Sequence, residues 1–253
     1  MVTIAIINQK GGVAKTTTSV NLAAQASLRY KTLIVDCDKQ ANLTNTFDQL
    51  DAETNIKNAF LGEPFEVVNV RKNIDLIPST PKLIGIERII QEEIRRESIL
   101  DGFLSPLAKD YDYCFLDCPP DIGLITVNAL ATADYVIIPL KADSYSLQGV
   151  DAMLPFIQEV RDKINPKLTI LGFVLTQYNE RLNISKQIME EIHSNGWDVA
   201  LFDSMIRINT SLADSQFHKK TIFEYDKNSN GAKDYMQLGK EVLTKIKKIE
   251  NEK

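Results

Sequence analysis

Short apolar runs, rich in branched residues, recur along the chain, and each of them ends at a polar residue or a proline. Six such runs cover residues 2–7, 32–35, 74–77, 113–116, 135–138 and 168–175. Continuous apolar runs of this length are typical of strands that are buried on both faces of a parallel sheet.

Between these runs lie segments whose apolar residues recur at helical spacing. They lie near residues 16–28, 83–96, 99–109, 124–131, 147–164, 185–194 and 232–248. The alternation predicts an α/β fold, with a doubly wound, mostly parallel sheet flanked by helices. No low-complexity linker or internal repeat interrupts the pattern, so we expect one domain over residues 1–253.

Composition narrows the class of protein only a little. Hydrophobic residues make up 44% of the 253 residues and charged residues 25%, which is ordinary for a globular domain. No stretch of eighteen or more apolar residues is present, so we expect no transmembrane helix, and the immediate first strand leaves no room for a signal peptide. The net charge of −5 gives no overall sign of a nucleic-acid protein, so such a role would need a local basic patch.

The three cysteines, Cys37, Cys114 and Cys118, lie in or beside apolar runs. Their number is odd and their spacing is not that of metal ligands, which argues against a disulfide framework or a zinc site. We expect all three to be buried and reduced, as in a cytoplasmic protein.

The first loop carries the strongest chemical signal. It reads N-Q-K-G-G-V-A-K-T-T-T over residues 8–18, between a predicted strand and a predicted helix. Such a turn cradles phosphates, because backbone N–H groups and the helix N-terminus face the anion. Lys15 can reach the β- and γ-phosphates, and the Thr16 hydroxyl can bind Mg²⁺. The loop residues expected to bind the phosphates are Gly11, Gly12, Val13, Ala14, Lys15, Thr16 and Thr17.

This loop departs from the general pattern G-x-x-x-x-G-K-[ST], because Gln9 and Ala14 stand where that pattern has glycine. A Cβ at position 14 is tolerated only where the backbone stays near right-handed helical angles. Since the chain is about to enter the helix, we expect Ala14 to adopt such angles.

Two further strands end in carboxylates. Asp36 ends the second run, and Asp38, two residues later, points the same way and reaches further into the site. Asp117 follows four apolar residues and precedes Pro119 and Pro120, an arrangement suited to holding Mg²⁺. For Asp38, a helix cap before a helix near Asn42 is the competing interpretation.

Together these motifs resemble the deviant Walker A motif, first switch and second switch of the ParA/MinD superfamily. The matching patterns are K-G-G-x-[G/A]-K-T-T, D-x-D-P-Q-x-N with Lys39 in place of proline, and D-x-P-P. Later segments, V-L-T-Q-Y-N-E-R at 174–181 and residues 206–235, also align without gaps. The chain is identified by this resemblance as a ParA-type, Soj-like partition ATPase over essentially its whole length.

The resemblance implies an ATP-sandwich homodimer in which Lys10 reaches the partner's phosphates. It also implies slow, partner-stimulated ATP hydrolysis, with Lys10, Lys15 and Asp38 as catalytic residues and Mg²⁺ held by Thr16, Asp38 and Asp117. Gln177 and Asn209 are candidate adenine contacts. Expected partners are DNA and a ParB-type centromere-binding protein, with no membrane, in the cytoplasm on the nucleoid. Longer relatives carry an N-terminal helix-turn-helix, which we do not expect here.

In relatives, non-specific DNA binding uses basic residues of the C-terminal third, and phosphate neutralisation makes it sensitive to salt. Two family arginine positions are occupied here by Ile208 and Ser211, and Arg207 stands at a proline position. A solvated helix face is the competing interpretation for each basic residue. The candidates are Arg181, Lys186, Arg207, Lys219, Lys220, Lys240, Lys245, Lys247 and Lys248.

Three other functions remain open. A MinD-like membrane ATPase would need a detached amphipathic tail, whereas Val242, Leu243, Ile246 and Ile249 run on from the domain and are expected to pack against it. An iron–sulfur carrier would need a companion for Cys118. A metabolic synthetase using the same phosphate loop would need turnover that depends on a small carboxylic substrate.

Overall fold

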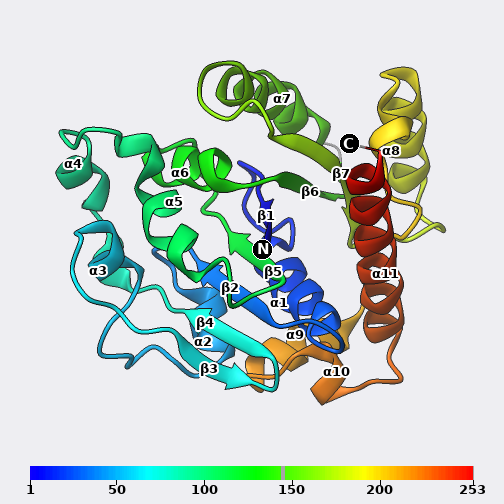
Figure 1. Ribbon diagram of the computed structural model, residues 1–253. Coiled ribbons are helices and arrows are strands. Elements are labelled where there is room, and N and C mark those ends of the chain that lie inside the picture. Colours follow the sequence, from blue (N-terminus) through cyan, green and yellow to red (C-terminus); the bar gives the residue numbers. More distant parts are fainter. Residues whose placement is uncertain (144–145, 253) are drawn as a thin grey trace.

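The computed structural model describes residues 1–143 and 146–252, apart from the side chains of 146–149, 151, 152, 198 and 199. Seven strands form one sheet in the order β3-β4-β2-β5-β1-β6-β7 (Figure 1). All neighbouring strands pair in parallel except β3, which is antiparallel to β4. The strands are β1 Val2–Ile6, β2 Thr32–Asp36, β3 Val68–Arg71, β4 Ile74–Ile77, β5 Tyr113–Asp117, β6 Tyr135–Lys141 and β7 Thr169–Thr176.

Helices cover both faces of the sheet, so the predicted doubly wound α/β fold is confirmed. The α-helices are α1 Lys15–Ala26, α2 Asn42–Thr46, α3 Ile56–Phe60, α4 Ile86–Ile90, α5 Ile99–Leu104, α6 Leu124–Thr132, α7 Ser146–Lys163, α8 Asn183–Ser194, α9 Thr210–Phe217, α10 Ile222–Tyr225 and α11 Asn230–Asn251. Short 3₁₀ turns occupy Pro81–Leu83, Arg96–Ser98, Ser105–Leu107 and Trp197–Ala200.

The sheet separates two hydrophobic cores. Its strands therefore do not alternate between apolar and polar residues. On one face, alternate side chains such as Leu33 and Leu116 pack with α3 to α8. On the other, Ile34 and Phe115 pack with α1, α2, α10 and α11. Each central strand is therefore apolar on both sides, as parallel sheets require.

The six predicted strands are all present, whereas several helices differ from the prediction. The helix expected near 83–96 is broken into a 3₁₀ turn, α4 and a second 3₁₀ turn, because Gly85 and Arg95 have φ values of 81° and 60°. A helix beginning near Asn42 was anticipated, and α2 begins there, whereas the strand β3 and the short helices α3, α9 and α10 were not predicted. Elements of four to eight residues offer too few periods for a hydrophobic pattern to identify.

Both edges of the sheet are partly covered. Strand β3 carries a register shift between Asn69 and Arg71, and the Arg71 guanidinium bonds Glu224 and the Lys219 carbonyl. At the other edge, single bridges join Phe173 to Leu201 and Tyr178 to Arg207.

Helix α11 packs against α1 and β7 rather than extending from the domain (Figure 1). Val242 and Ile246 are buried, and Leu243 and Ile249 are partly buried against the same core. The expectation that this face packs on the domain is confirmed. Within the described residues, no helix is both long and apolar enough to cross a bilayer.

The burial of the three cysteines was also predicted. Cys37, Cys114 and Cys118 are buried free thiols, as expected. Asn128 on α6 is fully buried, donates to the Arg96 carbonyl and accepts the Leu100 amide, so it ties α6 to the segment at residues 96–100.

Candidate nucleotide site

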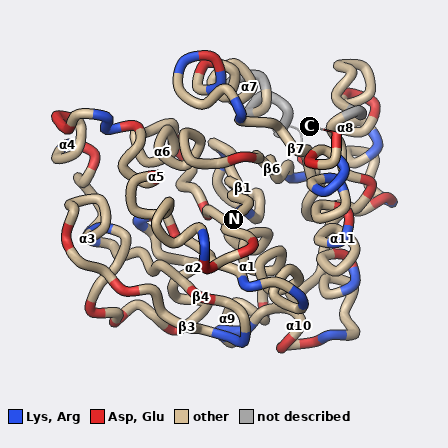
Figure 2. The backbone as a smooth tube through the Cα atoms, in the orientation of Figure 1, with Lys and Arg blue, Asp and Glu red and all other residues tan. Residues whose placement is uncertain are grey.

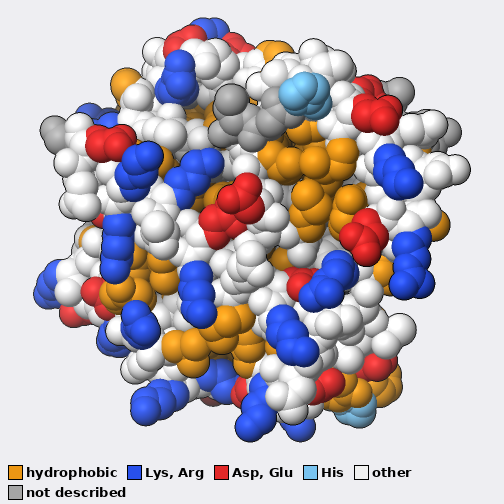
Figure 3. Space-filling view, turned by 90° about the vertical axis from the view of Figure 1, so that its right-hand side faces the viewer, with side chains coloured by type: hydrophobic (Ala, Val, Ile, Leu, Met, Phe, Trp, Pro, Cys, Tyr) orange, Lys and Arg blue, Asp and Glu red, His pale blue; other side chains and the backbone are white. Residues whose placement is uncertain are grey.

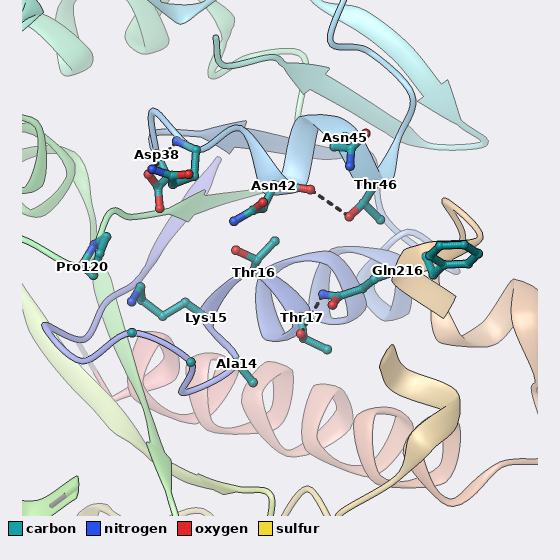
Figure 4. Close-up of a pocket in the computed structure, with 14 residues that line it drawn as sticks. Ala14, Lys15, Thr16, Thr17, Asp38, Asn42, Asn45, Thr46, Pro120 and Gln216 are labelled. Carbon is teal, nitrogen blue, oxygen red and sulfur yellow. Dashed lines mark hydrogen bonds between the residues drawn. The ribbon is translucent and has the colours of Figure 1, made fainter. Parts of the chain in front are cut away.

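A cavity of about 590 Å³ lies beyond the carboxyl ends of β1 and β2, where α1 begins. Ligands of doubly wound sheets bind at this edge. Figure 4 shows Lys15, Thr16 and Thr17 on one side of the cavity, with Asp38 and the polar side chains of α2 on the opposite side. Its lining includes Gly11, Gly12, Ala14, Asn42, Asn45 and Pro120.

The loop that forms one wall contains two residues with left-handed backbone angles. Gly12 has φ 73°, and Ala14 has φ 67° and ψ 32°. The expectation that Ala14 keeps right-handed angles was therefore wrong. The loop reverses direction immediately before α1, and the residue that makes this reversal is the last one outside the helix, where a left-handed Ala costs about 1–2 kcal/mol.

Lys15 is buried and folds back over its own loop. Its Nζ donates to the carbonyl oxygens of Asn8 at 2.9 Å and Lys10 at 3.1 Å. Burial lowers the pKa of Lys15, while the nearby charge of Asp117 opposes that shift. The ammonium group is thus held inside the loop by two carbonyl groups, which an anion at the same place can replace as its partners.

Thr16 and Asp117 meet at the floor of the site. Thr16 Oγ1 donates to Asp117 Oδ2 at 2.7 Å, and Ser19 Oγ donates to Asp117 Oδ1 at 2.9 Å. Burial raises the pKa of Asp117 to about 6, although both hydroxyl bonds act in the opposite direction. A hydroxyl and a carboxylate oxygen beside the phosphate loop are the donors that Mg²⁺ prefers.

The segment after β2 is fixed by a buried carboxylate. Asp36 accepts hydrogen bonds from the Thr44 amide at 2.8 Å, the Thr44 hydroxyl at 2.7 Å and the Asp38 amide at 3.1 Å. Ser79 Oγ donates to the Asp38 carbonyl at 2.7 Å. Burial and the neighbouring Asp117 raise the pKa of Asp36 to about 8. Asp36 therefore holds the backbone of Asp38, whose side chain lines the cavity.

Asp38 does not cap a helix. Helix α2 begins at Asn42, the residue before it is Ala41, and no side chain caps its N-terminus. Asp38 Oδ1 accepts the Gln40 amide at 2.9 Å instead. The competing interpretation of Asp38 as a capping residue is wrong.

Lys10 lies on the same loop, but it does not line the cavity. Its Nζ forms an ion pair with Asp143, just after β6, and both side chains are about seven-tenths buried. Lys141 Nζ lies 3.7 Å from the other carboxylate oxygen of Asp143. In this conformation the Lys10 side chain is held within its own subunit.

A second cavity, of about 420 Å³, adjoins the loop and brings the two adenine candidates together. Gln177 has φ 51°, and its Nε2 donates to the Gly12 carbonyl at 2.9 Å. Asn209 caps α9 by accepting the Ser211 amide at 2.8 Å. Both residues line this cavity with Gly12 and Thr17, so they lie beside the phosphate loop.

Sequence reasoning missed several residues of the site. Ser19 follows Thr16 by one helical turn, and this spacing could have identified it. Gln216, on α9, donates to Thr17 Oγ1 at 2.8 Å, and Phe217 lines the first cavity with 84% of its surface exposed (Figure 4 labels Gln216). Gln216 and Phe217 come from the unpredicted helix α9, and no local pattern marks them.

The candidate DNA contacts differ in how they are held. Arg207 bonds the buried Asp234 through its backbone N–H and its guanidinium, and Lys219 pairs with Asp48. Lys245 lies over the Phe202 ring, where burial lowers its pKa, and Lys247 bonds the Tyr30 hydroxyl at 2.9 Å. Figure 2 shows basic positions spread over several elements rather than gathered on one. The side chains of five candidates are exposed and form no ion pair or hydrogen bond with other described residues: Arg181, Lys186, Lys220, Lys240 and Lys248.

Comparisons with known proteins agree with this geometry. A family model described as an AAA domain, AAA_31, matches residues 1–170. Chromosome partitioning protein ParA of Myxococcus xanthus is 38% identical over 253 residues, which cover 95% of this chain and 87% of that protein. Sporulation initiation inhibitor protein Soj of Bacillus subtilis is 38% identical over 247 residues, which cover 94% of this chain and 97% of that protein.

A solved structure, cobyrinic acid a,c-diamide synthase from Mycobacterium smegmatis with a bound ATP analogue and magnesium, has a TM-score of 0.85 at 28% identity. The match covers 98% of this chain and 96% of that one. The two curated relatives are more similar in sequence and match along nearly the whole chain. The chain belongs to the ParA/Soj family of chromosome-partitioning P-loop ATPases.

Proposed function

We propose that the chain is a magnesium-dependent ATPase whose ATP-bound homodimer binds DNA without sequence preference. Slow ATP hydrolysis, stimulated by a ParB-type centromere-binding partner, ends each round of dimerisation and DNA binding. Repeated rounds segregate a plasmid or a chromosome. One observation carries the proposal: Thr16, which lines a cavity together with Lys15 and Asp38, donates its hydroxyl to the buried carboxylate of Asp117.

These side chains suit ATP with its metal. Thr16 and the carboxylates of Asp38 and Asp117 would hold Mg²⁺, which when bound neutralises phosphate charge. The glycine loop and the N-terminus of α1 present backbone N–H groups to the anion. Lys15 would exchange the Asn8 and Lys10 carbonyls for phosphate oxygens, since it already lies inside the loop.

Asp38 would orient the attacking water. Its side chain faces the cavity, and the bonds of Asp36 and Ser79 to its backbone fix where it stands. A carboxylate can orient a water beside a metal-bound phosphate without a raised pKa, as in other phosphoryl-transfer sites.

Lys10 would connect nucleotide binding to dimerisation. It leaves Asp143 and contacts the phosphates bound by a second subunit, so that two chains enclose the two nucleotides. DNA binding then depends on ATP, because only the dimer joins the basic residues of two subunits into one surface, and affinity through phosphates rises steeply with the number of contacts.

The test is binding of random-sequence duplex DNA with ATP, ADP or no nucleotide, over a series of salt concentrations. Wild type, Lys10→Ala and the exposed control Lys109→Ala are compared, and ATP hydrolysis is followed with and without Mg²⁺. We expect wild type to bind DNA only when ATP is present, and this binding to weaken as the salt concentration rises. Lys10→Ala should lose DNA binding, and Lys109→Ala should keep it.

Absence of DNA binding in every nucleotide state would contradict the partition proposal, but it would not contradict the proposed phosphate site. ATP turnover that requires a small carboxylic substrate would instead favour a synthetase. Asp38→Asn separates the steps: it should keep ATP-dependent dimerisation and DNA binding but abolish hydrolysis, and loss of dimerisation would contradict the role given to Asp38.

A further inference from the structure

A groove lies on the face of the molecule where the C-terminal end of α1 meets α11, away from the residues of the nucleotide site. Two adjoining cavities form it, of about 370 and 600 Å³. Both are lined by Leu28, Met236 and Lys240, so they are continuous with each other.

The floor of the groove is apolar. Met236 and Leu243 lie on α11, Phe223 lies on α10, and Leu28 follows α1 with 61% of its surface exposed. Apolar side chains gathered in a concave surface favour a partner that buries apolar groups of its own.

The rim of the groove is basic. Lys233, Lys240 and Lys247 recur at seven-residue intervals along α11, and Arg29 and Lys227 add two more cations. Among the described residues, none that lines either cavity is acidic. Figure 3 shows a face of the molecule on which apolar patches lie among lysine and arginine side chains, with acidic side chains between some of them. This local charge is opposite to the net charge of −5 of the whole chain.

Most of these basic side chains have no acidic partner within the described part of the chain. Arg29, Lys227, Lys233 and Lys240 are exposed, and none of them forms an ion pair within the described part of the chain. Among these five cations, only the Lys247 side chain contacts another described side chain, through the hydroxyl and ring of Tyr30. By contrast, Glu241, on another face of α11, is bonded to the amides of Asp203 and Ser204.

We propose that this groove binds an acidic amphipathic helix of a partner protein. The distance from Lys233 to Lys247 along α11 is about 21 Å, the length of about four helical turns. Apolar residues of the partner at i, i+3 and i+7 would pack on Met236, Leu243 and Leu28, and its flanking carboxylates would face the heptad-spaced lysines. The proposal does not depend on the proposed function.

The apolar floor distinguishes this partner from nucleic acid, whose backbone brings phosphates but no apolar side chains to match Met236 and Leu243. The concave shape distinguishes it from a membrane surface, which is bound by apolar side chains that project from the protein. Lys240 and Lys247 are also candidate DNA contacts, so the experiment includes DNA and lipid as alternatives.

The probe is a fluorescein-labelled synthetic helix with leucine at heptad spacing and glutamate on both flanks, and binding to the full chain is followed by anisotropy. A scrambled peptide of the same composition controls for charge alone. We expect the scrambled peptide to bind at least about tenfold more weakly, and binding of the designed helix to weaken with salt.

The variant Lys233→Glu/Lys240→Glu should lose about tenfold or more in affinity for the designed helix. Lys109→Glu/Lys167→Glu makes the same change of charge at exposed positions outside the groove and should bind like wild type. Both pairs are surface positions, and circular dichroism checks that each variant is folded.

Equal affinity of the groove variant and wild type, equal binding of the scrambled peptide, or no binding of the designed helix would each overturn the proposal. Duplex DNA and phosphatidylglycerol vesicles are tested with the same proteins. If the groove variant loses one of these ligands while wild type does not bind the helix, the groove is a surface for that ligand instead.

Discussion

Lys10, on the phosphate loop, forms an ion pair with Asp143, on the segment that follows β6. The two residues are 133 positions apart in the chain, and the fold brings them together because β1 and β6 are neighbouring parallel strands. In the proposed function Lys10 acts on a second subunit, so this ion pair must open before two chains can enclose ATP.

Asp143→Asn is therefore expected to favour dimerisation. Losing a partly buried ion pair of about 1 kcal/mol should lower the ATP concentration needed for half-maximal dimerisation about fivefold. Size-exclusion chromatography with light scattering, over a series of ATP concentrations, measures this change. Lys141→Gln, which leaves the Lys10–Asp143 pair in place, should behave like wild type. A higher ATP requirement in Asp143→Asn would show that Asp143 supports dimerisation rather than opposing it.

Ser19→Ala should weaken magnesium dependence without removing the site. Ser19 holds Asp117 in position, and loss of such a supporting hydrogen bond typically lowers metal affinity about 10- to 100-fold. The measurement is the Mg²⁺ concentration that gives half-maximal ATP hydrolysis. Ser27→Ala removes a hydroxyl from the other end of the same helix, where it bonds the Ala24 carbonyl, and should leave this concentration unchanged.

Ala14→Gly should be tolerated in spite of the greater freedom that glycine gives the unfolded chain. Ala14 has left-handed angles, so glycine relieves strain there, and the free energy of unfolding should stay equal or rise by up to about 1 kcal/mol. Ala213→Gly, in the interior of α9, should instead lower it by about 0.5–1 kcal/mol. Urea denaturation compares the two variants, and a similar loss in both would show that Ala14 is not strained.

Gly172→Ala should destabilise the fold. A Cβ on Gly172 would lie 2.6 Å from the Ala200 carbonyl oxygen and 2.9 Å from the Phe202 ring, so the free energy of unfolding should fall by about 1–3 kcal/mol. Gly102→Ala, in α5, meets no atom within 4 Å and should raise stability by about 0.5–1 kcal/mol. Thermal unfolding of both variants distinguishes crowding at Gly172 from a general effect of replacing glycine.

Local sequence was sufficient to predict the six parallel strands and the phosphate loop. Central strands of a parallel sheet are apolar on both faces, and the loop's glycines, Lys15 and Thr16 lie within a few residues of one another. The position of Asp117 beside the loop was also predicted, because its strand ends at the same edge of the sheet as the strand before the loop.

What could not be predicted depends on contacts between distant residues or on backbone angles. Asp143 meets Lys10 only through strand order, and Gln216 reaches Thr17 from a helix too short for its periodicity to be recognised. The angles of Ala14 were predicted wrongly because the helix start was taken to extend one residue further, whereas Ala14 still belongs to the reversal of the loop.

The two edges of the sheet limit how copies of this chain can meet. Strand β3 has four residues and a register shift, and the side chain of Arg71 is bonded to the segment beside it. At the opposite edge, residues near Leu201 and Arg207 already take up hydrogen-bonding positions of β7. In the described part of the chain, neither edge offers a long run of free backbone groups to a strand from another molecule. Self-association by sheet extension, the usual route to fibrils, is therefore disfavoured.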